Sequence, residues 1–179
     1  MSSLPPGSQV VTASTGNHGA GVAKASLLFD QKVKVFIPST TTAQKKEKLI
    51  KLGDRAYAPE KWSVKDIIQH LIDAERIFTY RALRFARNDS TALPGFEENE
   101  YAPAAQGNKR SIDDLLSEFR ALRGSTLDLF ESFDKEMLEK VGKASGVDIS
   151  VLAIGFAIVG HTRHHVNVIR EKYFPLIEN

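Results

Sequence analysis

The stretch Gly160-His161-Thr162-Arg163-His164-His165 holds three of the chain's five histidines and lies near the end of the last helix that the sequence predicts. His161 and His165 are four residues apart, so on a helix their side chains project from the same face, one turn apart. This spacing is typical of metal ligands. A zinc, nickel or iron ion held by such a pair needs at least one more protein ligand.

Only His18 and His70 remain as further histidine ligands. His70 lies midway along a second predicted helix and is the better candidate, whereas His18 lies in a glycine-rich stretch of a different character. Residues 151–159 before the cluster are apolar on every side and predict a helix buried in a bundle, where unpartnered ionisable rings are costly. Spacing alone leaves His164 open as an alternative to His165. The competing interpretation is a partly exposed pair near the negative end of a helix dipole.

Composition excludes several classes of site. The 179 residues suffice for one good core with an appended piece, and the absence of cysteine excludes disulfides, thiolate metal sites and a cysteine nucleophile. The N-terminus lacks the pattern of a secretion signal, and no apolar run approaches the roughly 18 residues of a membrane span. We therefore expect a cytoplasmic protein without a membrane partner.

The charge is divided unevenly along the chain. Residues 1–53 hold seven lysines against Asp30 and Glu47, a balance of +5, whereas residues 54–179 have a balance of −3. The basic excess is spread over a short segment without interleaved aromatic side chains, so nucleic-acid binding is not expected. The two parts differ in composition, and we expect two domains with these bounds.

The first 53 residues predict alternating strands and helices. Strand patterns occur at residues 9–13 and 32–38, and helical patterns at residues 20–29 and about 42–52, where Gly53 ends the second helix. A lone fragment of this kind cannot bury both faces of its strands.

The remaining chain predicts three long helices. The first begins at Ser63, which forms a capping-box pattern with Asp66, and runs to about residue 87. The second opens at Ser111, and the third begins at 148–150 and runs to about Phe174. Residues 88–110 predict a long loop, and residues 140–147 a break. Three such helices need a fourth to close a bundle, and we expect residues 20–29 or 42–52 to supply it.

Four stretches in this helical part are distinctive. They are Tyr57-Ala58-Pro59-Glu60-Lys61-Trp62-Ser63-Val64-Lys65-Asp66, His70-Leu71-Ile72-Asp73-Ala74-Glu75-Arg76, Tyr80-Arg81-Ala82-Leu83-Arg84 with Leu93-Pro94-Gly95-Phe96 after it, and the final His161-x-x-His164-His165. From about Tyr57 onward this combination resembles the DinB/YfiT-like superfamily of four-helix-bundle metalloproteins. The resemblance implies a mainly α fold, a DinB-like four-helix bundle in which the N-terminal α/β-derived fragment supplies or replaces the first helix.

The same resemblance implies a divalent metal site, most often zinc or nickel, at His70, His161 and His165. It also implies metal-dependent thiol S-transfer, with low-molecular-weight thiols such as bacillithiol, or hydrolysis of a small-molecule substrate. Asp73 is a candidate base or orienting group for His70, and Glu75 is expected to pair with Arg76, Arg163 or solvent. The alternative is a non-catalytic helical bundle that is chimaeric or binds a ligand or a second copy of itself, with an empty or vestigial metal site.

Residues 11–23, Val-Thr-Ala-Ser-Thr-Gly-Asn-His-Gly-Ala-Gly-Val-Ala, are similar to the S-x-G-N-H-G loop and following helix of fold-type II pyridoxal-phosphate enzymes, the threonine dehydratase group. In that family the loop holds the substrate carboxylate. The match ends at about Gly53 and lacks the Schiff-base lysine, the phosphate-binding glycine loop and the rest of the sheet. We therefore expect no pyridoxal phosphate, and a fusion of residues 1–53 to the helical domain of residues 54–179.

Overall fold

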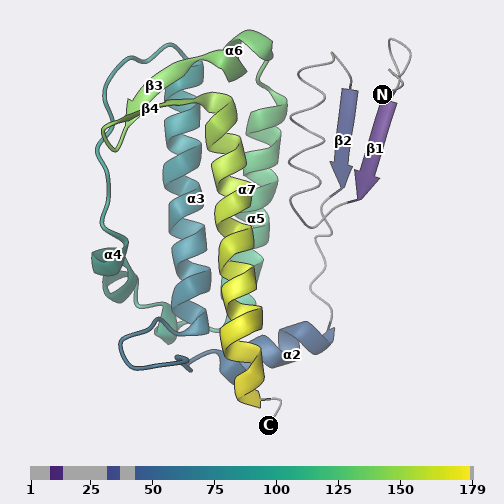
Figure 1. Cartoon of the computed structure of the whole chain (residues 1–179), viewed down its shortest axis with the longest axis vertical. Coiled ribbons are helices and arrows are strands. Elements are labelled where there is room, and N and C mark those ends of the chain that lie inside the picture. Colours follow the sequence, from purple (N-terminus) through teal and green to yellow (C-terminus); the bar gives the residue numbers. More distant parts are fainter. Residues whose placement is uncertain (1–8, 14–31, 37–42, 178–179) are drawn as a thin grey trace. The chain divides into compact units, whose positions relative to one another are not determined.

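The computed structural model describes residues 9–13, 32–36 and 43–177 (Figure 1). By its internal contacts the chain divides into two units, residues 1–42 and residues 43–179. Each unit is described by itself.

The first unit contains two described strands. β1 (Gln9–Ala13) pairs in parallel with β2 (Lys32–Phe36), with Gln9 opposite Lys32. Both strands occur where the alternating sequence pattern predicts them. The helix predicted at residues 20–29, and with it His18 and the Gly-rich loop that resembles pyridoxal-phosphate enzymes, lies outside the described residues.

Three long helices form the frame of the second unit. They are α3 (Val64–Ala86), α5 (Ile112–Glu131) and α7 (Val151–Val168), and α3 packs against both of the others (Figure 1). Each begins after a serine, Ser63, Ser111 or Ser150, whose hydroxyl accepts a hydrogen bond from the backbone N–H three residues on. Such caps satisfy donors that the first turn of a helix leaves unpaired. The helix starts predicted from these serines are confirmed.

The fourth helix, α2 (Ala43–Leu52), lies across one end of the three long helices (Figure 1). Leu52 is completely buried there, and α2 packs against the short 3₁₀ helix η3 (Phe174–Ile177) that follows the π-helical turn η2 (Ile169–Tyr173). The fold is therefore the predicted mainly α bundle, and the helical segment at the end of the N-terminal fragment supplies its first helix. No helix in the described part of the chain is long and apolar enough to cross a membrane.

The predicted loop after α3 contains a helix. α4 (Glu98–Ala105) and the 3₁₀ turn η1 (Gly107–Lys109) lie within it, and Pro103 sits inside α4. Pro103 lies in the second turn of α4, where it cannot donate the backbone hydrogen bond to the carbonyl four residues earlier, so this short helix lacks that bond. Gln106, in the left-handed conformation with φ of 53°, ends α4.

The predicted break before α7 is a short helix followed by a β-hairpin. α6 (Lys135–Glu139) precedes β3 (Val141–Ala144) and β4 (Val147–Ser150), which pair in antiparallel fashion. Ser145 and Gly146 form the turn with φ values of 53° and 80°, as a two-residue hairpin loop of positive φ requires. A β-carbon on Gly142 would lie 2.2 Å from the Phe85 ring, so glycine permits β3 to lie directly on α3.

Two apolar clusters fill the bundle, one at each end. The α2-end cluster includes Leu52, Val64, Ile67, Ile68, Ile72, Ile112, Leu115, Ile169 and Tyr173. The hairpin-end cluster includes Ala82, Phe85, Ala86, Leu93, Phe133, Ala144, Val151, Ile154 and Ile158. Along α3 and α7, His70, His161 and His165 lie between the two clusters.

Candidate metal centre

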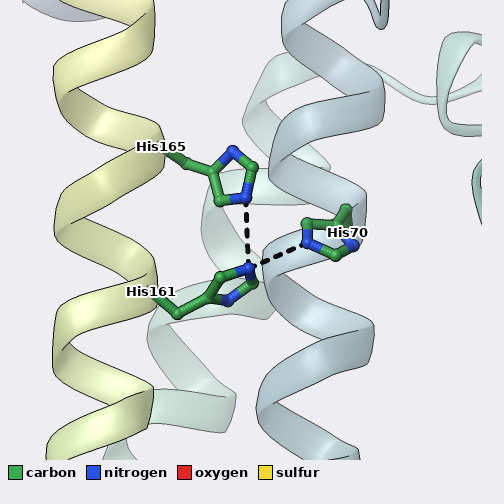
Figure 2. A group of neighbouring side chains, drawn as sticks. All are labelled: His70, His161 and His165. Atoms are coloured by element: carbon green, nitrogen blue, oxygen red, sulfur yellow. Dashed lines mark hydrogen bonds between the residues drawn. The ribbon is translucent and has the colours of Figure 1, made fainter. Parts of the chain in front are cut away.

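Three histidines from two helices meet between the apolar clusters. His70 projects from α3, and His161 and His165 project from successive turns of α7 toward it (Figure 2). His70 is 7% exposed, and the other two rings are half-buried. Among the described residues this is the one group of three potential metal ligands whose donor atoms lie close together, all within 4.8 Å of one another.

The distances between the ring nitrogens suit a shared cation. The Nε2 atom of His161 lies 2.9 Å from Nε2 of His70 and 3.1 Å from Nε2 of His165 (Figure 2). Two nitrogens bound to one zinc ion at about 2.0–2.1 Å are about 2.9 Å apart at a right angle and about 3.4 Å apart at the tetrahedral angle. Both pairs therefore have separations close to those of two ligands of one ion.

The rings are held in the neutral form that metal binding requires. Burial and, to a lesser extent, the nearby His161 together lower the pKa of His70 to about 4. Burial, followed by the neighbouring histidines His161, His70 and His164, lowers the pKa of His165 to about 3. The pKa of His161 is also lowered, by burial and by His164. At neutral pH all three imidazoles are uncharged, the state in which they bind metals.

Hydrogen bonding alone does not satisfy the cluster. A neutral imidazole Nε2 carries either one proton or one lone pair in the ring plane, so His161 can form a good hydrogen bond to only one of its two neighbours. A cation between the rings accepts a lone pair from every one of them. The donor set and its spacing therefore fit a late transition ion such as zinc or nickel.

Aromatic side chains cover the histidines. Trp62 stacks on His165 with ring centroids 6.4 Å apart, and its centroid lies 4.8 Å from that of His70. The Phe78 ring meets His161 edge-on at 6.0 Å. The hydroxyl of Tyr173 donates to the Trp62 carbonyl, and burial raises the pKa of that hydroxyl to about 12.

His164 lies outside the cluster. Its side chain is exposed, although its ring lies 5.1 Å from that of His165, and it is not among the three convergent ligands. Spacing alone left His164 and His165 as alternatives, and the orientation of α7 places His165 in the cluster and His164 outside it.

Asp73 is part of a separate surface network. It accepts a hydrogen bond from Gln69 at 3.0 Å and lies 3.8 Å from Arg76, and within the described residues no hydrogen bond joins it to a histidine. Burial raises the pKa of its carboxyl. Its proposed role as a base stays a prediction.

Glu75 pairs differently from the expectation. Its carboxylate is 2% exposed and accepts two hydrogen bonds of 2.8 Å from Arg123 on α5. Arg123 also donates to the hydroxyl of Thr162, the residue after His161, and that hydroxyl donates to the Ile158 carbonyl. The sequence did not indicate Arg123 as the partner of Glu75, because no local pattern links the two residues. Helical geometry did indicate that Glu75 faces another helix, since five residues along α3 place its side chain about 140° around the helix from that of His70.

The fold and this site define a helical bundle with three histidines converging between two of its long helices. The sequence profile of the DinB superfamily matches residues 51–169. The chain therefore belongs to the DinB superfamily, and this part of the predicted resemblance is confirmed. No curated protein matches the sequence. For the resemblance of residues 11–23 to pyridoxal-phosphate enzymes, no comparison gives support.

A solved structure shares the fold. It is described as "YfiT from Bacillus subtilis is a probable metal-dependent hydrolase with an unusual four-helix bundle topology", and it aligns with a TM-score of 0.58 over 77% of this chain and 93% of that protein. The aligned residues are 13% identical. The likeness shows the four-helix DinB-type fold, and the three-histidine cluster is compatible with a divalent metal.

Proposed function

We propose that His70, His161 and His165 bind one divalent metal ion, zinc or nickel, and that the protein uses it in a thiol S-transfer or hydrolysis reaction on a small molecule. The observation that carries this proposal is the convergence of three neutral imidazoles, one buried and two half-buried, with Nε2 separations of 2.9 and 3.1 Å. Holding such rings largely away from water without a shared partner is costly, so the cluster has a functional explanation.

The chain supplies an environment suited to that chemistry. The three imidazoles are neutral ligands, so an ion held by them keeps its charge and has positions open to water or substrate. A divalent ion in such a site lowers the pKa of bound water toward neutrality and favours the thiolate form of a bound thiol. Trp62 packs against His165 and Phe78 against His161, and these aromatic contacts limit the access of bulk water to the rings.

Two comparisons support the choice of reaction class. Membership of the DinB superfamily rests on residues 51–169, and the aligned YfiT structure is described as a probable metal-dependent hydrolase. A low-molecular-weight thiol as co-substrate follows from the resemblance alone. Both reactions use a metal-activated nucleophile, so one site serves either.

Metal titration of the purified full-length chain tests the binding proposal. We expect about one equivalent of zinc or nickel in calorimetry and in elemental analysis. His70→Ala, His161→Ala and His165→Ala each remove a ligand and are expected to weaken binding by more than about 100-fold. His164→Ala is the matched control, because it removes an adjacent exposed imidazole and is expected to leave binding unchanged.

Turnover separates an enzyme from a binding protein. The metal-loaded chain is assayed with a thiol and an electrophilic acceptor, and separately with amide and ester substrates. Activity that disappears in His161→Ala and persists in His164→Ala supports the proposal. Stoichiometric metal binding without turnover of any of these substrates would favour the non-catalytic alternative.

A further inference from the structure

A second polar feature lies on the same side of the α3 helix as the histidines. A cavity of about 310 Å³ is lined by Phe78 and Arg81 of α3, by Ile154 and Ala157 of α7, and by the β3–β4 hairpin. This volume is at the lower end of the range of small-molecule sites. Nothing in the proposed metal chemistry uses it.

Arg81 is the charged group buried in this wall. Its side chain is 6% exposed, and its Nη2 donates to the Pro94 carbonyl at 2.8 Å and to the Ser145 hydroxyl at 3.0 Å. These two bonds use both protons of Nη2. Among the described residues, nothing accepts from Nε or Nη1, and no carboxylate forms an ion pair with Arg81.

The contrast with the other buried ion is informative. Glu75, at 2% exposure, has a bidentate arginine partner, whereas the guanidinium of Arg81 has donors to spare and a full charge. A buried charge without a counter-ion is costly unless a ligand provides one. Guanidinium groups hold carboxylates by charge-assisted hydrogen bonds, so the unused donors suit an anion in the cavity.

The position of Arg81 relates the cavity to the histidines. Arg81 follows His70 by eleven residues, which is about three turns, so the two project from nearly the same face of α3. The Phe78 ring lies near both sites: its centroid is 6.0 Å from the guanidinium carbon of Arg81 and 6.0 Å from the centroid of His161. The guanidinium carbon is therefore no farther than about 12 Å from the centroid of the His161 ring, roughly the length of an extended peptide of three to four residues.

The walls indicate what else the ligand carries. Apart from Arg81 and Ser145, they are largely apolar, with Phe78, Ile149 and Ile154 among them. Asp148 also lines the cavity, but its side chain is 69% exposed and lies 3.6 Å from Lys143. One cation with a carboxylate nearby favours a singly charged anion over a phosphate dianion.

We propose that Arg81 and this cavity bind the carboxylate of the substrate whose reacting group lies at the three histidines, and that the substrate is a small monocarboxylic acid with an apolar body. This inference rests on the proposed metal function and names its substrate class. Arg81 is a specificity residue that contacts the substrate away from the reacting atoms.

The proposal is tested with pairs of thiols that bind the metal through sulfur and differ only in whether the other end carries a carboxylate or a hydroxyl. The zinc-loaded full chain is titrated by calorimetry with 8-mercaptooctanoate and with its neutral analogue 8-mercaptooctanol. We expect the acid to bind about tenfold more tightly or better, because its carboxylate reaches Arg81. 3-Mercaptopropionate is too short to reach and is expected to bind no more tightly than 3-mercaptopropanol.

Variants of the cavity residues show which side chain causes the preference for the acid. Arg81→Gln is expected to remove the preference for the acid while leaving the affinity for the alcohol and for zinc unchanged, and Arg81→Lys to retain part of it. Arg84→Gln is the matched control on α3, because Arg84 pairs with Asp89 outside the cavity. Should Arg81→Gln disturb folding through the bonds to Pro94 and Ser145, Ala157→Leu fills the cavity with Arg81 in place and is expected to remove the same preference.

The outcomes separate the two proposals. Equal affinity of acid and alcohol for the wild-type chain, or a preference that survives in both Arg81→Gln and Ala157→Leu, overturns the carboxylate site and leaves the metal site intact. If the zinc-loaded chain binds neither thiol, or if no zinc binds, the proposed function fails and the carboxylate site fails with it.

Discussion

Two polar groups are buried in the middle of this bundle, and they are satisfied in different ways. Glu75, Arg123 and Thr162 join α3, α5 and α7 through complementary donors and acceptors at 2.8–2.9 Å. The histidine cluster brings together three groups of the same kind, with only one good hydrogen bond available to the central ring. The first arrangement explains stability without a ligand, whereas the second leaves a ring nitrogen without a good hydrogen bond, which the proposed metal would satisfy.

The difference also concerns position. Thr162, which accepts from Arg123, is the residue next to His161, so the ion pair fixes the rotation of α7 at the turn that carries the candidate ligand. The network thus orients the histidines without contacting them. The following experiments perturb one group at a time, beginning with the substitution of largest expected effect and ending with that of smallest.

Breaking the ion pair from one side has the largest expected effect on folding. Arg123→Met leaves the carboxylate of Glu75 buried without a partner, and we expect the free energy of unfolding to fall by about 3–5 kcal/mol. Urea denaturation followed by circular dichroism measures this in the metal-free chain. A loss below about 1 kcal/mol would show that Glu75 finds another partner or reaches solvent.

Zinc is expected to stabilise the folded chain by binding at the histidine cluster alone. At a free concentration about 100 times its dissociation constant, zinc adds about 2.7 kcal/mol to the free energy of unfolding if it binds only the folded chain. The stabilisation should vanish in His161→Ala and persist in His164→Ala. An equal stabilisation of all three proteins places the zinc elsewhere.

The metal-free histidine cluster makes stability depend on pH. An unfolded histidine has a pKa of about 6.5, and in the folded chain the pKa is about 4 for His70 and about 3 for His165. As the pH falls from 6.5 the unfolded chain takes up protons that the folded chain excludes. The free energy of unfolding therefore decreases, by at most about 1.4 kcal/mol per pH unit for each ring, and levels off below about pH 3.

His70→Leu is the control for this profile. It removes one titrating ring and fills its place with an apolar side chain, so the slope between pH 6.5 and 4 should become shallower. A wild-type slope equal to that of His70→Leu contradicts the assignment of the acid sensitivity to the cluster. Measurements use metal-free protein with a chelator present.

The smallest effect is expected for the link between the two groups. Thr162→Val keeps the shape of the side chain but removes the acceptor for Arg123. We expect a loss of about 1 kcal/mol in unfolding free energy and a weaker affinity for zinc. Unchanged zinc affinity alongside the lost stability means that the network supports the fold without orienting His161.

Local features were predictable from the sequence. Ser63, Ser111 and Ser150 cap the three long helices as their patterns indicate. The convergence of His70 with His161 and His165 followed from helical spacing together with the resemblance, which chose His165 over His164. The helix starts were predictable because they depend on periodicity within one helix or on motifs a few residues long, whereas the meeting of α3 and α7 at the histidines came from the resemblance.

The missed features depend on contacts between distant parts of the chain. Arg123 meets Glu75 across 48 positions, and Arg81 meets Ser145 across 64. The β3–β4 hairpin was read as a break because its strands have only four residues each, and Gly142, which seemed a breaker, is needed for contact with Phe85. Tertiary packing decides such features, and single-sequence patterns do not record it.

The central claim is that three imidazoles from α3 and α7 share one ion. X-ray absorption spectroscopy of the zinc-loaded full-length chain measures the ligands of that ion directly. We expect about one equivalent of zinc with three imidazole nitrogens at about 2.0–2.1 Å, and one fewer in His70→Ala. A zinc environment of oxygen ligands alone, or one that is identical in the wild-type chain and in His70→Ala, would contradict the account.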